Sequence, residues 1–153
     1  HLSPHLAADR EVVLAAVSQD GRALDCLPWA LHDDEEVVLA ALAETGDAIV
    51  SASQRLQGDR EFLLLAVKLD SGILDLVSQE FQDDKEIILA AISHSGEALF
   101  RASDRLREDR EVVLAAVSEN GCSLQAAAEH FAEDKEVVLA ALAASRDERC
   151  FDE

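Results

Sequence analysis

Apolar and polar positions along this chain recur with a period of 25 residues. Each repeat opens on an aspartate, and six repeats begin at Asp9, Asp34, Asp59, Asp84, Asp109 and Asp134. When that aspartate is counted as position one, position three is always Glu, position six is always Leu, and position eight is always Ala. A fixed period of this length is typical of repeat architectures, in which each repeat packs only on its neighbours.

The first half of each repeat predicts an α-helix. Aspartate at position one is a favourable N-cap, and glutamate in the first turn complements the positive end of the helix dipole. The run that follows, residues 12–17 in repeat one, is apolar on all sides, which indicates a helix packed between neighbours. In two repeats a second acid, Asp33 before Glu36 and Asp83 before Glu86, has the spacing of a capping box.

The second half of each repeat predicts a shorter helix after a turn. We expect glycine at position thirteen to end the first helix in the left-handed conformation. Apolar residues at positions sixteen, nineteen and twenty-three then give a stripe with one buried face. In repeat one, Pro28 is expected to kink or delay this second helix. The glycines at position thirteen are Gly21, Gly46, Gly96 and Gly121, whereas repeat three has Gly72 one residue late and repeat six has Arg146.

These patterns predict an all-α fold: a right-handed α-solenoid of six 25-residue helix–turn–helix repeats. A strand–helix repeat of the leucine-rich type is the alternative. Its Leu-x-x-Leu-x-Leu frame is absent, and Asp-x-Glu with Ala-Ala favours helix. Alternate repeats are more alike than adjacent ones, because residues 50–56 resemble residues 100–106. We therefore expect a 50-residue superperiod.

The predicted array spans residues 9–144. Residues 1–8 are interpreted as the remnant of a preceding repeat or a cap, since Leu6 falls where position twenty-three of such a repeat would lie. Residues 145–153 are interpreted as a C-terminal cap or tail. The chain starts at His1 and contains no Met, so we expect a processed product or an excerpt of a longer chain.

The pattern Asp-(Arg/Lys)-Glu-Val-Val-Leu-Ala-Ala-Val…Gly…Ala-Leu…Ala-Ser…Leu resembles the repeats of domain of unknown function 4116. The resemblance covers residues 9–142. It implies tandem short helical repeats, which are abundant in microalgae and present in some intracellular bacteria. The family has no established activity, so the resemblance implies no functional residues.

Charge narrows the classes of partner. The formal net charge is −19, from 32 acidic and 13 basic side chains. This balance argues against nucleic acid and anionic lipid, and it suits protein partners with a basic surface; simple solubility is the alternative. The longest apolar runs are far shorter than the roughly 20 residues of a membrane span, which predicts a soluble protein. The family resemblance, through its abundance in microalgae, implies the chloroplast as the compartment if the source is algal. Three unpatterned cysteines predict neither a disulfide framework nor a zinc site: Cys26, Cys122 and Cys150.

The candidate partner-binding residues are those that depart from the repeat. Trp29 could anchor a partner or cover an exposed end of the array. Phe100 and Val50 occupy position seventeen, where other repeats are polar, and could contact a partner or pack between second helices. Asp34 and Asp84 belong to an acidic ladder that could dock a basic partner, with helix capping as the alternative. The Arg or Lys at position two is expected to pair with acids of the adjacent repeat.

No catalytic chemistry is predicted. The five histidines share no position and form no i, i+4 pair, and the chain has no Gly-rich phosphate loop, nucleophile elbow or Cys–His spacing. We therefore expect no enzyme activity, no cofactor and no metal. The expected function is a non-enzymatic scaffold or accessory subunit for protein–protein interaction in a larger assembly. The family resemblance implies an algal photosynthetic supercomplex as one setting. The alternative is a recruiting module excised from a larger multidomain enzyme or effector.

Overall fold

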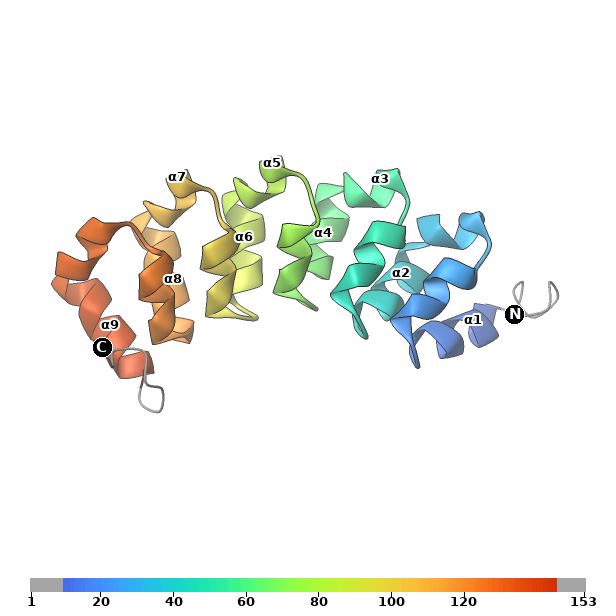
Figure 1. Cartoon of the computed structure of the whole chain (residues 1–153), viewed down its shortest axis with the longest axis horizontal. Helices are drawn as coiled ribbons and strands as arrows, with labels where there is room; N and C mark the ends of the chain where they lie inside the picture. The colour runs from blue at the N-terminus through green and yellow to red at the C-terminus, as the bar shows by residue number, and fades with distance from the viewer. Residues whose placement is uncertain (1–9, 146–153) are drawn as a thin grey trace. The chain divides into compact units, whose positions relative to one another are not determined.

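The computed structural model describes residues 10–145, and every element in that range is helical (Figure 1). The chain divides into two compact units, residues 1–76 (the N-terminal unit) and 77–153 (the C-terminal unit). The all-helical prediction is confirmed, and each repeat begins with its longest helix. These helices are α1 (Arg10–Val17), α2 (Glu35–Leu42) and α4 (Arg60–Ala66) in the first unit, and α6 (Lys85–Ile92), α8 (Arg110–Glu119) and α9 (Lys135–Ala144) in the second.

Aspartate at position one caps these helices. The Asp34 carboxylate accepts hydrogen bonds from the backbone N–H groups of Glu36 and Val37, each at 3.1 Å. These two groups have no partner inside the helix, so the side chain satisfies them. The same pair of bonds is made by Asp59, Asp84, Asp109 and Asp134, while Asp9 lies outside the described residues.

The prediction of a single second helix is wrong for repeats one to five, and the second half of repeat six lies outside the described residues. Two short helical turns take its place, separated by extended residues. The break occurs at Ser53, at Ser103 and at Ala128 as well as at Pro28, so the proline fits a break common to the repeats rather than causing one. The short elements are η1 (Gly21–Cys26), η2 (Trp29–Asp33), η3 (Gly46–Ser51), α3 (Gln54–Gln57) and η4 (Ser71–Asp75) in the N-terminal unit, and α5 (Gln79–Gln82), η5 (Gly96–Arg101), α7 (Asp104–Arg107), η6 (Gly121–Ala126) and η7 (Glu129–Glu133) in the C-terminal unit.

The glycines at position thirteen do not adopt the left-handed conformation. No residue between 10 and 145 has a positive φ. Gly21, Gly46, Gly96 and Gly121 are instead buried first residues of 3₁₀ helices. A Cβ on Gly21 would lie 2.5 Å from the carbonyl oxygen of Ala41 in the next repeat. The glycine is therefore required by close approach between repeats, and the left-handed prediction is wrong.

The long helices form the core, and their two apolar stripes face different neighbours. In the N-terminal unit α2 packs against α1 and α4, and in the C-terminal unit α8 packs against α6 and α9 (Figure 1). In helix α1 the residues at positions five and nine are fully buried, and those at positions four and eight are half-buried. In helix α9 the residues at positions four and eight are fully buried instead, and the residue at position nine is exposed. Positions four and eight therefore face the preceding repeat, and positions five and nine face the following one. In the internal helices α2 and α8 all four are buried: Val37, Val38, Ala41 and Leu42 in α2, and Val112, Val113, Ala116 and Val117 in α8.

Candidate functional site

The acidic ladder is occupied by contacts between repeats. In the N-terminal unit, Nη2 of Arg10 lies 3.3 Å from Oδ1 of Asp34 and 2.6 Å from Oε2 of Glu36. In the C-terminal unit, Nζ of Lys85 lies 2.8 Å from both Asp109 Oδ2 and Glu111 Oε2. Arg110 makes the equivalent contacts with Asp134 and Glu136. The position-two base of one repeat thus binds positions one and three of the next.

The two candidate acids of this ladder, Asp34 and Asp84, have structural contacts of their own. Asp34 combines its capping bonds with the ion pair to Arg10. Asp84 accepts hydrogen bonds from the backbone N–H groups of Glu86 at 3.0 Å and Ile87 at 3.2 Å. Their geometry is that of helix caps, which favours the structural alternative over partner docking.

The Lys85–Asp109 pair predicts a pH dependence of stability. The hydrogen bond from Lys85 is the main cause that lowers the pKa of Asp109 below 3.8, and the same carboxylate raises the pKa of Lys85 above 10.5. The stabilisation that comes from the lowered pKa of Asp109 is present above pH 3.8 and is lost as the pH falls through the folded-state pKa of this acid. The stabilisation that comes from the raised pKa of Lys85 is present below pH 10.5 and is lost as the pH rises through the folded-state pKa of this base. The pair therefore stabilises the fold between these limits.

Replacing Lys85 with glutamine should lower the free energy of unfolding by a similar amount from about pH 5 to 9. The difference from the wild type should shrink below pH 3.8 and above pH 10.5. Urea unfolding at a series of pH values measures it. Lys68→Gln, at an exposed lysine in the other unit, is the control and should show no such window. A difference that persists unchanged at pH 2.5 would contradict the assignment.

A second type of junction explains why alternate repeats match. Nε of Arg55 donates to Oδ1 of Asp33 at 2.9 Å, Nη2 donates to the Asp33 carbonyl at 3.0 Å, and the Ser53 hydroxyl donates to the same carboxylate. The pKa of Asp33 is lowered mainly by the hydrogen bond from Ser53, and next by the hydrogen bond from Arg55. The prediction that Asp33 joins a capping box is therefore wrong, because this carboxylate binds the following repeat. Fifty residues further on, Asp83, Ser103 and Arg105 form the same cluster.

Trp29 is the most exposed large apolar residue among the described ones, with 68% of its surface accessible. Its ring stacks on His32, with 5.1 Å between ring centroids and 25° between planes. His32 is itself buried, with Nδ1 2.5 Å from the carbonyl oxygen of Ser51 and Nε2 3.2 Å from that of Leu27. The tryptophan therefore rests on an imidazole fixed by the backbone on both sides.

Val50 is the sequence neighbour of Ser51, whose carbonyl binds the His32 ring beneath Trp29. Val50, 63% exposed, precedes Ser51 in η3, and Ser51 is bonded through its carbonyl to His32 and through its hydroxyl to Asp25. We call Asp25, Trp29, His32 and Val50 the Trp29 surface. Phe100, 49% exposed, lies on η5 of the C-terminal unit. Val50 and Phe100, which each occupy position seventeen of their repeats, are thus both exposed.

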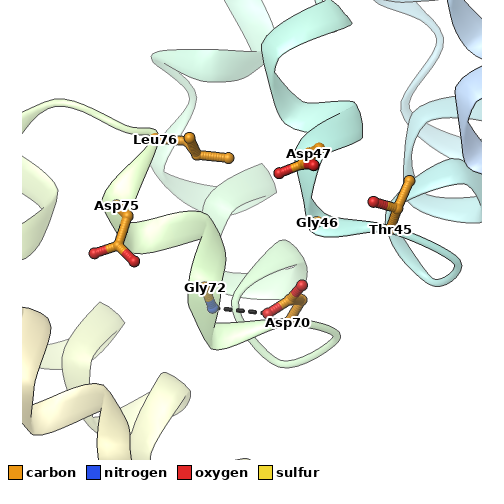
Figure 2. Close-up of a pocket in the computed structure, with 7 residues that line it drawn as sticks. All are labelled: Thr45, Gly46, Asp47, Asp70, Gly72, Asp75 and Leu76. Atoms are coloured by element: carbon orange, nitrogen blue, oxygen red, sulfur yellow. Dashed lines mark hydrogen bonds between the residues drawn. The ribbon is translucent and has the colours of Figure 1, made fainter.

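A pocket of about 300 Å³ lies between η3 and η4 of the N-terminal unit (Figure 2). Asp47, Asp70 and Leu76 line it, and the side chains of Asp47 and Leu76 point toward one another, whereas Asp75 points away. Oδ1 of Asp70 accepts from the Gly72 N–H at 2.7 Å, which caps η4. This cap can be recognised in the sequence by an Asp or Asn at position twelve of the odd repeats, because Asp20 and Asn120 cap their 3₁₀ helices in the same way.

Cysteine and metal chemistry are limited in the described residues. Cys26 is a free, exposed thiol. Cys122 is half-buried and disulfide-bonded, which the unpatterned cysteines did not predict. Between residues 10 and 145 no group of three or more His, Cys, Asp or Glu side chains could hold a metal ion.

Within the same range no helix is long and apolar enough to cross a membrane. The fold defines a class of all-helical proteins made of tandem repeats. The model of the Domain of unknown function (DUF4116) matches residues 34–82 and 84–132, two tandem copies of about one superperiod each, and the chain belongs to this family. No curated protein and no solved structure matches the chain.

Proposed function

We propose that this chain is a non-enzymatic helical-repeat scaffold or accessory subunit that binds other proteins. The observation that carries this proposal is Trp29, a large aromatic side chain exposed to solvent on a rigid platform. Residues that dominate protein interfaces are enriched in tryptophan, and preorganisation lowers the entropic cost of binding. The residues at the same position of other repeats, such as Gln54 and Asp104, are polar.

The partner surface that fits best combines basic and apolar side chains. Asp25 accepts a hydrogen bond from Ser51, the residue that also binds His32 beneath the tryptophan, and the pocket between η3 and η4 offers Asp47 and Asp70 beside Leu76, which is 43% exposed. An arginine or lysine side chain has an aliphatic stem and a cationic end, so it matches such a lining. The net charge of −19 favours the same class of partner through long-range attraction.

Replacing Trp29 with alanine should weaken partner binding by about 2 kcal/mol or more, which is roughly thirtyfold in affinity. Stability should change by less than about 0.5 kcal/mol, because the side chain is mostly exposed. The measurement is native size-exclusion chromatography of extract from the source organism, with crosslinking mass spectrometry to locate the contact. The tagged wild-type chain should elute far above its 16.5 kDa mass, and the variant should shift toward that mass.

Leu65→Ala is the matched control, since Leu65 is 51% exposed on α4 and outside the Trp29 surface. It should leave the elution unchanged. A wild-type chain that elutes only as a free monomer at its native concentration would contradict the proposal.

The setting we propose is a larger assembly such as an algal photosynthetic supercomplex, supported by family resemblance alone. The alternative is that the repeats recruit partners for an enzyme or effector. Sequencing the full-length transcript distinguishes the two. A catalytic domain encoded in the same chain would favour the recruiting module, whereas repeats with only a targeting segment would favour the subunit.

A further inference from the structure

The buried ring of His32 lies between two backbone carbonyl oxygens. Nδ1 is 2.5 Å from the oxygen of Ser51 in repeat two, and Nε2 is 3.2 Å from the oxygen of Leu27 in repeat one. A carbonyl oxygen only accepts hydrogen bonds, whereas a neutral imidazole has one N–H donor and one lone pair. In the neutral ring, one nitrogen therefore faces an oxygen without a hydrogen atom between them. Only the protonated ring, which has two N–H donors, forms both hydrogen bonds.

Other repeats place donors against the same two carbonyl groups. His32 occupies position twenty-four, and its acceptors are position nineteen of the same repeat and position eighteen of the next. Gln57, at position twenty-four of repeat two, donates through its side-chain amide to the position-nineteen carbonyl of Ala52 at 2.9 Å. Arg107, at position twenty-four of repeat four, donates through Nε to the position-eighteen carbonyl of Ala126. Each acceptor of His32 thus corresponds to one that a permanent donor binds elsewhere in the chain.

Two contacts of the ring favour its cationic form. Trp29 stacks on it with 5.1 Å between ring centroids, and a cation over the face of a tryptophan is attracted by the electrons of that ring. The hydroxyl of Ser51, whose carbonyl faces Nδ1, donates to the carboxylate of Asp25. A buried cation is costly unless its donors are hydrogen-bonded, and here both ring nitrogens have an acceptor. The site is therefore built to hold a proton.

The elements joined to His32 carry more acids than bases. Helix η2 packs on α2, and His32 is hydrogen-bonded to Leu27 at the end of η1, to Ser51 at the end of η3 and to Ser53 at the start of α3. The acids on these elements are Asp25 of η1, Asp33 of η2, Glu35 and Glu36 of α2, and Asp47 of η3. The other titratable groups are Arg22 and Cys26 of η1 and Arg55 of α3, which is already paired with Asp33. This excess of negative charge also favours protonation.

We propose that His32 is a proton-operated switch that controls the Trp29 surface. The protonated ring joins repeats one and two and holds Trp29 stacked on it, and loss of the proton to solvent breaks one of the two hydrogen bonds. Histidine changes its charge between about pH 5 and 8, so we expect the switch to act in that range. The effect on binding rests on the proposed function: the indole is preorganised on the acidic side, which lowers the entropic cost of partner binding there.

Nitrogen-15 NMR of the full chain between pH 5 and 8.5 tests the switch without any partner. In spectra that correlate the ring protons with both ring nitrogens, His32 should carry two N–H protons at the acidic end and one at the basic end. The indole N–H signal of Trp29 should shift with the same midpoint. In His32→Gln the amide donates at every pH, as that of Gln57 does, so this shift should disappear. His94→Gln, at an exposed histidine of the C-terminal unit, is the matched control and should keep it.

Three results would overturn the switch. They are a His32 ring that stays neutral down to pH 5, a ring that stays protonated up to pH 8.5, and an indole shift that persists in His32→Gln. The first two are measured on the wild type, so they do not depend on the folding of a variant.

The effect on binding is measured on the complex that the tagged chain forms in extract of the source organism. Wild-type affinity should fall at least about threefold from pH 6 to pH 8, and that of His32→Gln should stay the same. An equal fall for both chains would overturn control of binding by His32. A chain that elutes as a monomer at both pH values contradicts the proposed function itself, and the NMR titration then decides the switch alone.

Discussion

Replacing Leu42 with alanine is expected to destabilise the N-terminal unit by about 2–5 kcal/mol. Leu42 occupies position nine of α2, is 1% exposed, and lies on the stripe that faces the following repeat. Alanine in its place removes buried apolar surface and leaves a cavity that neighbouring helices fill only in part. The same change at Leu142, position nine of α9, should cost less than about 1 kcal/mol, because more than half of that side chain is already exposed.

Urea unfolding monitored by far-UV circular dichroism and by tryptophan fluorescence measures both changes at low protein concentration. Trp29, the only tryptophan, lies in the same unit as Leu42, so its fluorescence reports on that unit. The two units can unfold at different urea concentrations, because repeat proteins are stabilised by contacts between neighbours. Equal losses at Leu42 and Leu142 would contradict the assignment of position nine to the following repeat.

The features that could be predicted from sequence are those determined within one repeat. Aspartate at position one and glutamate at position three favour the start of a helix through bonds only two or three residues long. The apolar run after them requires burial on more than one side, whichever residues cover it. The pairing of position-two bases with acids of the next repeat was also predictable, since a fixed period brings equivalent positions together.

The second half of each repeat was not predictable in the same way. Its two short turns meet at an extended residue whose backbone binds another repeat: the Ser53 N–H donates to the His32 carbonyl, and the Ser103 N–H to that of Gln82. Such bonds join residues 21 apart, so they leave no local pattern. The apolar spacing of 3 and 4 residues is compatible with one helix as well as with two turns.

The candidate site was predictable only as a departure from the repeat. Trp29 and Val50 could be selected because other repeats are polar or different at their positions, but His32 gave no such signal. Its role depends on the carbonyl oxygens of Leu27 and Ser51, which approach it only in the folded structure. The acids of the ladder were conspicuous in sequence for a structural reason, since capping requires them in every repeat.

Replacing Gly21 with alanine should destabilise the N-terminal unit by about 1–3 kcal/mol. The new Cβ would lie 2.5 Å from the Ala41 carbonyl oxygen and 2.6 Å from Cγ2 of Thr45. The side chain of Thr45 can rotate, but the backbone oxygen belongs to α2 and cannot move without shifting that helix. Thr45→Ser in the Gly21→Ala background should therefore recover only part of the loss.

Urea unfolding of Gly21→Ala, Gly21→Asn and Gly58→Ala separates this explanation from a left-handed one. If Gly21 were needed for a positive φ, asparagine would be tolerated better than alanine, because asparagine visits that region more readily. Close approach predicts the reverse, since asparagine adds atoms where even a Cβ clashes. Gly58 is the control: its φ is −101° and its Cβ would be 3.4 Å from the nearest atom, the Gln54 carbonyl oxygen. Alanine there should be neutral or stabilise by up to about 1 kcal/mol, because it restricts the unfolded chain. A Gly21→Asn variant more stable than Gly21→Ala would show that conformation, rather than contact with α2, selects glycine at this position.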